Sequence, residues 1–65
     1  MMKPWLIEYV EDGKRCTTRW KWLDNARCMA QWQADRLRQP VRIYSCLPGS
    51  RVLTDTVYPA TIAHR

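Results

Sequence analysis

An Asp-Gly dipeptide between two β-prone runs constrains the fold of this chain more than any other feature. Asp12-Gly13 follows residues 5–10 and precedes residues 15–22, two runs rich in aromatic and β-branched side chains. A two-residue type I′ turn needs positive φ at both central positions, and Asp-Gly is among the dipeptides that best supply it. The sequence therefore predicts a β-hairpin in which Glu11 faces Lys14.

This turn also fixes which side chains share a face of the hairpin. The register places Tyr9 opposite Cys16, Ile7 opposite Thr18 and Trp5 opposite Trp20. Successive side chains of a strand point to opposite faces. The face predicted to be core consists of Trp5, Ile7, Tyr9, Cys16, Thr18, Trp20 and Trp22. The face predicted to be basic and solvated consists of Leu6, Glu8, Val10, Arg15, Thr17, Arg19 and Lys21.

Residues 25–38 contain no Gly, Pro, Val, Ile or Thr, which favours a helix. Asp24 is predicted as its N-cap, and Pro40 ends it. At 100° per residue one apolar face emerges, consisting of Ala26, Met29, Ala30, Gln33 and Leu37 with Ala34 at its margin. The opposite face consists of Arg27, Gln31, Asp35 and Arg38.

The C-terminal part of the chain predicts further strands. Residues 41–47 are expected to form a third strand, and Pro48-Gly49 suits a type II turn. A fourth strand over residues 51–58, which stays an open alternative, would place Arg42 opposite Asp55 and Tyr44 opposite Leu53. We therefore expect an α+β fold, a small antiparallel sheet in the order β-β-α-β with one helix on one face. Residues 1–58 would form this single domain and residues 59–65 a flexible tail.

Cysteine and histidine usage argues against several classes of protein. Cys16, Cys28 and Cys46 are an odd, widely spaced set, which predicts free thiols and a cytoplasmic location. The apolar run at residues 5–7 is too short for a secretory signal or a membrane span. With His64 as the single histidine and carboxylates scattered along the chain, we expect no metal, no cofactor and no enzymatic activity.

The basic balance of the chain points to an anionic partner. Eleven Lys and Arg oppose six Asp and Glu, giving a formal net charge of +5. Arginine favours bidentate contacts with phosphate or carboxylate. The predicted binding residues are Lys14, Arg15, Thr17, Arg19, Lys21 and Arg42. We expect them to contact nucleic acid; the alternatives are an acidic protein surface, as for an inhibitor or adaptor, and a solvated sheet face that binds nothing.

Trp32 offers a second, apolar candidate site. It lies on the flank of the predicted helix together with Cys28 and Met29, where it would anchor a protein partner if the flank is exposed. An open strand edge beside the third strand, left if the fourth does not pair, would also allow a homodimer.

The order and size of the predicted elements resemble those of known proteins: a hairpin, a short helix and a strand. The hairpin has the sequence WLIEYVEDGKRCTTRW. Over about residues 5–47 the chain resembles the very small proteins carried by lambdoid phages and prophages. Phage inhibitors of host RNA polymerase share such a β-β-α-β order, and some integrase arm-binding domains place a helix against a small DNA-reading sheet. The resemblance implies a bacterial or phage accessory protein and assigns no functional residue.

Overall fold

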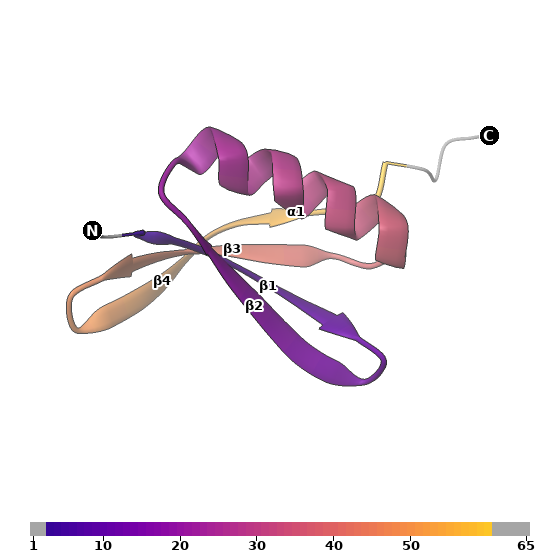
Figure 1. Ribbon diagram of the computed structural model, residues 1–65, viewed down its shortest axis with the longest axis horizontal. Helices are drawn as coiled ribbons and strands as arrows, with labels where there is room; N and C mark the ends of the chain where they lie inside the picture. The colour runs from indigo at the N-terminus through magenta and orange to yellow at the C-terminus, as the bar shows by residue number, and fades with distance from the viewer. Residues whose placement is uncertain (1–2, 61–65) are drawn as a thin grey trace.

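The computed structural model describes residues 3–60 and forms one four-stranded antiparallel sheet with one helix on one face (Figure 1). The elements are β1 (Trp5–Glu11), β2 (Lys14–Trp20), α1 (Leu23–Leu37), β3 (Val41–Leu47) and β4 (Ser50–Val57). The strand order is β2-β1-β3-β4, so β1 and β3 are the central strands. The expected α+β class is confirmed, and the fourth strand is present. Because β4 pairs with β3, the open edges of the sheet are β2 and β4 rather than β3.

The first hairpin has the predicted register. Asp12 and Gly13 have φ angles of 54° and 77°, as a type I′ turn requires. Glu11 faces Lys14, and the three pairs beyond them follow as predicted as far as Trp5 and Trp20. The second hairpin turns at Gly49, whose φ of 80° fits the third position of a type II turn.

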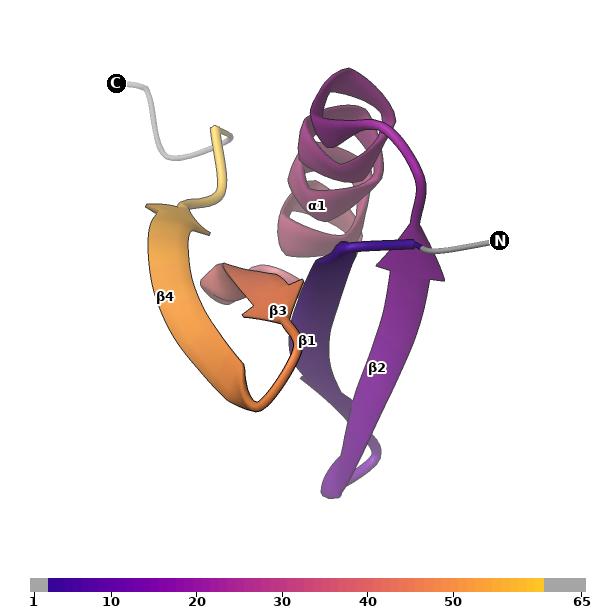
Figure 2. The same ribbon diagram turned by 90° about the vertical axis from the view of Figure 1, so that its left-hand side faces the viewer.

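The core lies between α1 and the two central strands (Figure 2). Its fully buried members are Ile7, Ala26, Ala30, Ala34, Val41 and Ile43. Three alanines on one face of the helix let its backbone approach the sheet closely. Trp5, Tyr9 and Trp20 are partly buried against this cluster, as the hairpin register predicts. The indoles therefore close the sides of a core whose centre is built from small aliphatic side chains.

The helix begins earlier than its sequence predicts. It starts at Leu23 with Trp22 in the N-cap position, and no side chain caps it. Asp24, predicted as the N-cap, instead lies in the first turn, where its negative charge still interacts favourably with the helix dipole. The helix ends at Leu37, and Arg38 follows in the left-handed conformation. The predicted cap residue is therefore wrong, whereas the helix itself and its alanine face are confirmed.

Two faces of the hairpin differ from the prediction at one residue each. Trp22 was expected in the core but is 61% exposed, because β2 ends at Trp20 and the chain bends before alternation can bury Trp22. Leu6 was expected on the solvated face but is only 3% exposed. It lies on a central strand between its cross-strand partners Arg19 and Tyr44, whose long side chains flank it on that face.

A β-bulge changes the predicted pairing of the last two strands. Tyr44 pairs with Leu53 as expected, but the register shifts between Ile43 and Tyr44. Arg42 consequently faces Thr56 rather than Asp55, and the predicted Arg42–Asp55 pair is wrong. A bulge moves subsequent side chains to the other face. It thus takes the Asp55 carboxylate to the helix side.

The chain after β4 returns along the helix. Gln31 Nε2 donates to the Tyr58 carbonyl at 3.0 Å, and the Ala60 amide donates to Asp35 Oδ1 at 2.8 Å. These contacts half-bury Gln31 and Asp35, two residues of the face opposite the core. Of the predicted tail, residues 61–65, including His64, lie outside the described residues. Over residues 3–60 no helix is long and apolar enough to cross a membrane.

Candidate functional site

The sheet face away from α1, here called the outer face, carries side chains from all four strands. By strand pairing it consists of Leu6, Glu8, Val10, Arg15, Thr17, Arg19, Arg42, Tyr44, Cys46, Arg51, Leu53 and Thr56. Four of these residues are arginines, and one is a carboxylate. At neutral pH these five charges leave a net +3 on the outer face.

Glu8 is the centre of this charged surface. Its side chain is only 11% exposed, and its oxygens lie 3.6 Å from Arg15 Nε and 3.6 Å from Arg42 Nη1. The Tyr44 hydroxyl donates to Glu8 Oε1 at 3.3 Å. A poorly solvated carboxylate needs such partners. Arg15 and Arg42 nevertheless stay 76% and 60% exposed, so their guanidinium groups are open to a further anion.

The other two arginines of the outer face have no carboxylate partner among residues 3–60. Arg19 Nη1 donates to the Lys3 carbonyl at 3.2 Å. The guanidinium of Arg51 lies over the Tyr44 ring, 5.5 Å from its centroid. Both side chains are thus held by neutral groups and keep their full charge for a ligand.

The four arginines span much of the outer face. Arg15 and Arg19 are four residues apart on β2, which corresponds to about 13 Å along the strand. Arg51 is on β4, and three strand spacings of about 4.8 Å separate β2 from β4. The cations therefore extend over roughly 13 Å along the strands and roughly 14 Å across them.

A hollow of about 530 Å³ opens beside Glu8 on this face. Arg15 and Arg42 contribute to its wall. Leu53 and Thr56 of β4 line it as well. The hollow forms where β1 continues past Glu8, its last residue paired with β3. Its wall combines the charged side chains of Glu8, Arg15 and Arg42 with apolar side chains such as Val10 and Leu53.

Four of the six predicted binding residues come together in the structure. Arg15, Thr17, Arg19 and Arg42 share the outer face. Lys14 does not, because alternation places it on the helix side with its partner Glu11. Lys21 does not either: it follows the end of β2, and its Nζ lies 5.2 Å from the centroid of the Trp22 ring.

Five residues of the outer face, all on β3 and β4, are absent from both the predicted solvated face and the predicted binding residues: Tyr44, Cys46, Arg51, Leu53 and Thr56. Of these, Tyr44 contacts both Glu8 and Arg51. Tyr44 and Arg51 lie on the outer face because Arg42, Tyr44 and Cys46 alternate along β3, and Arg51 faces Cys46. Strand alternation along the predicted third strand is enough to place Tyr44 on the same face as Arg42. Arg51 depended on the fourth strand, which the sequence left open.

On the helix side, by contrast, cations and carboxylates pair with each other. Arg36 donates to both oxygens of Glu11 at 3.0 and 3.1 Å, and Arg27 donates to Asp55 at 2.6 Å. Hydrogen bonds from Arg36 hold the pKa of Glu11 below its ordinary value. Arg27, followed by the Thr56 amide, holds the pKa of Asp55 low in the same way. Cations without a carboxylate partner among residues 3–60 therefore lie both on the outer face, as Arg19 and Arg51 do, and away from it, as Lys14, Lys21 and Arg38 do.

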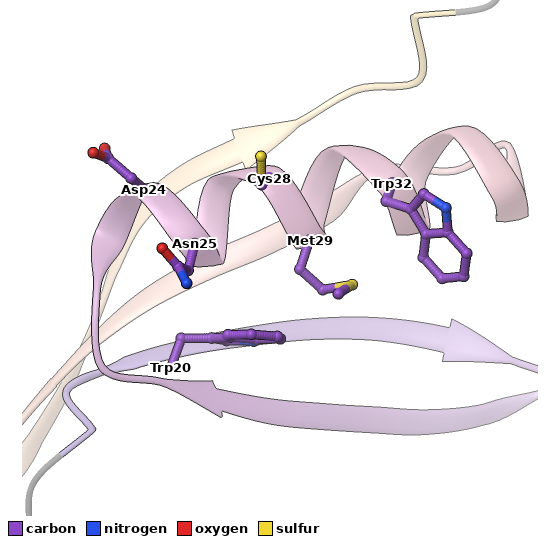
Figure 3. Close-up of a pocket in the computed structure, with 6 residues that line it drawn as sticks. All are labelled: Trp20, Asp24, Asn25, Cys28, Met29 and Trp32. Carbon is purple, nitrogen blue, oxygen red and sulfur yellow. The ribbon is translucent and has the colours of Figure 1, made fainter.

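The flank of the helix carries an apolar groove beside β2. Its lining consists of Trp20, Asp24, Asn25, Cys28, Met29 and Trp32. Figure 3 shows Met29 and Trp32 directed from α1 toward the strands, whereas Cys28 points away from them. Trp32 is 57% exposed, and the Arg36 guanidinium lies 5.3 Å from its ring centroid. Trp32 is therefore exposed, which is the condition under which the sequence predicts a partner anchor there.

The described residues contain no cluster of three or more side chains able to hold a metal ion. Comparison of the chain with protein-family models, with curated proteins and with solved structures finds no match. The resemblance to lambdoid phage proteins stays a prediction.

Proposed function

We propose that the protein is a non-catalytic nucleic-acid-binding module whose outer face contacts the phosphate backbone. The observation that carries this proposal is the gathering of Arg15, Arg19, Arg42 and Arg51 on one face with a single, largely buried carboxylate. Guanidinium groups bind phosphate oxygens in a bidentate manner. Neutralising several phosphates releases counterions, which drives binding.

The character of the outer face favours nucleic acid over an acidic protein surface. Protein interfaces usually have an apolar centre with few charges and a polar rim. Here the centre is Glu8 with its arginines. Leu6 beside it is buried, and the exposed aliphatic side chains of this face, Val10 and Leu53, lie around the hollow. Charges at the centre are more typical of surfaces that bind phosphates.

The position of the rings favours duplex over single-stranded nucleic acid. A single-strand platform stacks successive bases on aromatic rings that lie among the cations. Trp5 and Trp20 pack against the core on the helix side, and Tyr44 is covered by Arg51. The arginine positions, about 13 Å apart, are comparable with a major groove about 12 Å wide. The outer face therefore suits phosphates on both sides of such a groove.

A cytoplasmic location belongs to this proposal. Cys16, Cys28 and Cys46 are all free thiols in the structure. A reducing compartment keeps thiols free, and nucleic acid is accessible there. An accessory role in a bacterium or phage, as implied by the likeness of element order, would be compatible with such a module.

Binding of a fluorescent duplex, measured by anisotropy at low ionic strength, tests the proposal. Arg19→Gln and Arg51→Gln each remove one charge from the outer face. Arg38→Asn is the matched control: it removes one charge at the end of α1, and Asn tolerates the left-handed conformation found there. Loss of one phosphate contact should weaken binding by roughly tenfold for each outer-face variant, about 1.4 kcal/mol.

The control should change affinity by much less than either outer-face variant. Equal losses in all three variants would mean that net charge alone determines binding and would overturn the assignment to the outer face. No binding of duplex DNA or duplex RNA by the wild-type protein would overturn the proposed function itself.

A further inference from the structure

The edge of β2 is open along its whole length. β2 pairs with β1 on one side, and no other strand of residues 3–60 pairs with it. The other edge strand, β4, is interrupted by the bulge next to Asp55, which disrupts a regular ladder. Between the two edges, β2 is therefore the more regular template for an added strand.

The register shows which backbone groups face this edge. In a two-residue hairpin the pair next to the turn exchanges both hydrogen bonds, and this exchange recurs at every second pair. Glu11–Lys14 is that first pair, so Lys14, Cys16, Thr18 and Trp20 direct their backbone toward β1. The amide and carbonyl groups of Arg15, Thr17 and Arg19 consequently point outward and can accept a further strand.

The apolar groove lies directly beside this edge on the helix side. Trp20 belongs to the strand edge and to the groove, because it is the last residue of β2 and lines the groove. Its Nε1 donates a hydrogen bond to Thr18 Oγ1 at 2.8 Å. Met29 and Trp32 come down from α1 on the same side (Figure 3). The groove measures about 490 Å³, within the range of roughly 300–1,000 Å³ in which proteins hold small ligands. It is large enough for apolar side chains of a strand added to β2.

The two faces of β2 specify opposite chemistry for such a strand. On the outer face its side chains would lie next to Arg15 and Arg19, which favours carboxylates. On the helix side they would lie next to Cys16, Thr18 and the groove, which favours aliphatic or aromatic side chains. An occupant complementary to both faces alternates acidic and apolar residues.

Charge also disfavours a second copy of this chain as the occupant. Two β2 strands paired antiparallel about Thr17 would place Arg15 of one copy opposite Arg19 of the other. Like charges directly opposite each other destabilise a sheet. The cations of β2 thus protect the edge against self-pairing and leave it open to an acidic strand.

We propose that β2 is a docking edge for an extended peptide segment that alternates acidic and apolar residues. The segment pairs with the backbone of Arg15, Thr17 and Arg19 and inserts its apolar side chains beneath Trp32 and Met29. This is β-strand addition, in which main-chain hydrogen bonds give affinity and alternate side chains give specificity. The site goes beyond the proposed nucleic-acid function and involves a different partner.

A blocked synthetic peptide that alternates aspartate with leucine or valine is the probe. Two control peptides share its apolar residues: one has lysine in place of aspartate, and the other is N-methylated at its aspartates. N-methylation keeps the charge and removes the amide donors that would face β2. Binding is followed through the amide and indole signals of the isotope-labelled protein.

We expect saturable shifts at the amides of Arg15, Thr17 and Arg19 and at the indoles of Trp20 and Trp32. Both control peptides should bind at least about tenfold more weakly. Trp32→Ala removes a half-exposed side chain, so the variant should fold, and it should weaken the probe peptide about fivefold or more. Equal affinity for the N-methylated peptide would overturn strand addition, as would no saturable shift up to about 1 mM peptide.

Two variants distinguish a failure of the docking edge from a failure of the nucleic-acid function. Trp32→Ala should leave duplex binding unchanged because Trp32 is on the helix side. Arg51→Gln should weaken duplex binding and leave peptide binding unchanged because Arg51 is on β4, at the far side of the sheet. Peptide shifts confined to Arg42 and Arg51 would mean simple electrostatic attraction to the outer face and would also overturn the docking edge.

Discussion

Glu8 on β1 and Arg42 on β3 are direct cross-strand partners, with 3.6 Å between Glu8 Oε1 and Arg42 Nη1. Arg15 of β2 reaches the other oxygen of the same carboxylate. One buried acid therefore joins side chains of three strands, and it holds two exposed guanidinium groups in place. Glu8 is the single negative charge on a face that we propose binds phosphates.

Glu8→Gln should strengthen duplex binding. The amide keeps an acceptor for the Tyr44 hydroxyl and removes the charge that opposes phosphate. We expect affinity to rise about threefold to tenfold, measured by anisotropy at fixed salt. A weaker-binding variant would contradict this prediction and would show that positioning of Arg15 and Arg42 by Glu8 matters more than its charge.

The two neighbouring tryptophans at the end of β2 should differ sharply in their effect on stability. Trp20 packs against the core cluster, whereas Trp22 is exposed in the bend before α1. We expect Trp20→Ala to lower the free energy of unfolding by roughly 2 kcal/mol or more and Trp22→Ala by about 0.5 kcal/mol or less. Urea denaturation measures both free energies of unfolding. Similar losses of stability in the two variants would contradict the burial of Trp20 and the exposure of Trp22.

Acid should destabilise the fold through Glu11 and Asp55. Their folded-state pKa values are below the ordinary values of 4.5 and 3.8, because Arg36 and Arg27 hydrogen-bond the charged forms. A depressed pKa contributes stability that is present above the ordinary pKa and is lost as pH falls through the folded value. The melting temperature should therefore fall below about pH 4.5.

Variants that remove these partners check the cause. Glu11→Gln and Arg36→Gln should each flatten the acid limb of the melting curve to a similar extent, because each removes the same ion pair. An acid limb that is unchanged in both variants would show that other groups produce it.

The centre of the core should tolerate even small losses of volume poorly. Ile7 on β1 is fully buried among the alanines of α1. Ile7→Val should lower the free energy of unfolding by about 0.5–1.5 kcal/mol. Val52→Ala, at an exposed position of β4, should change it by less than about 0.5 kcal/mol. The reverse order would contradict the position of the core.

Most of the fold could be predicted from local signals. The register of the first hairpin depends on Asp12-Gly13, whose two positive φ angles leave one way to pair the flanking strands. The third strand, with bounds Val41–Leu47, follows from the helix stop at Pro40 and the turn at Gly49. Turns and helix ends of this kind are determined by a few neighbouring residues, so they can be predicted without knowing how the rest of the chain folds.

The remaining features depend on contacts between elements. A bulge in β4 carries no clear sequence mark, yet it takes Asp55 from the outer face to Arg27 on the helix. Burial of Leu6 follows only when β1 has neighbours on both sides. Arg51 joins the candidate site only because β4 pairs with β3, and Lys21 leaves it only because β2 ends at Trp20.

The salt dependence of duplex binding tests the central claim most directly. If the four arginines of the outer face each neutralise one phosphate, the plot of log K against log salt concentration should have a slope of about −3.6. Arg19→Gln and Arg51→Gln should each make it less steep by about 0.9, and Arg38→Asn should leave it unchanged. A slope near zero, or the same slope in all four proteins, would contradict phosphate binding by the outer face.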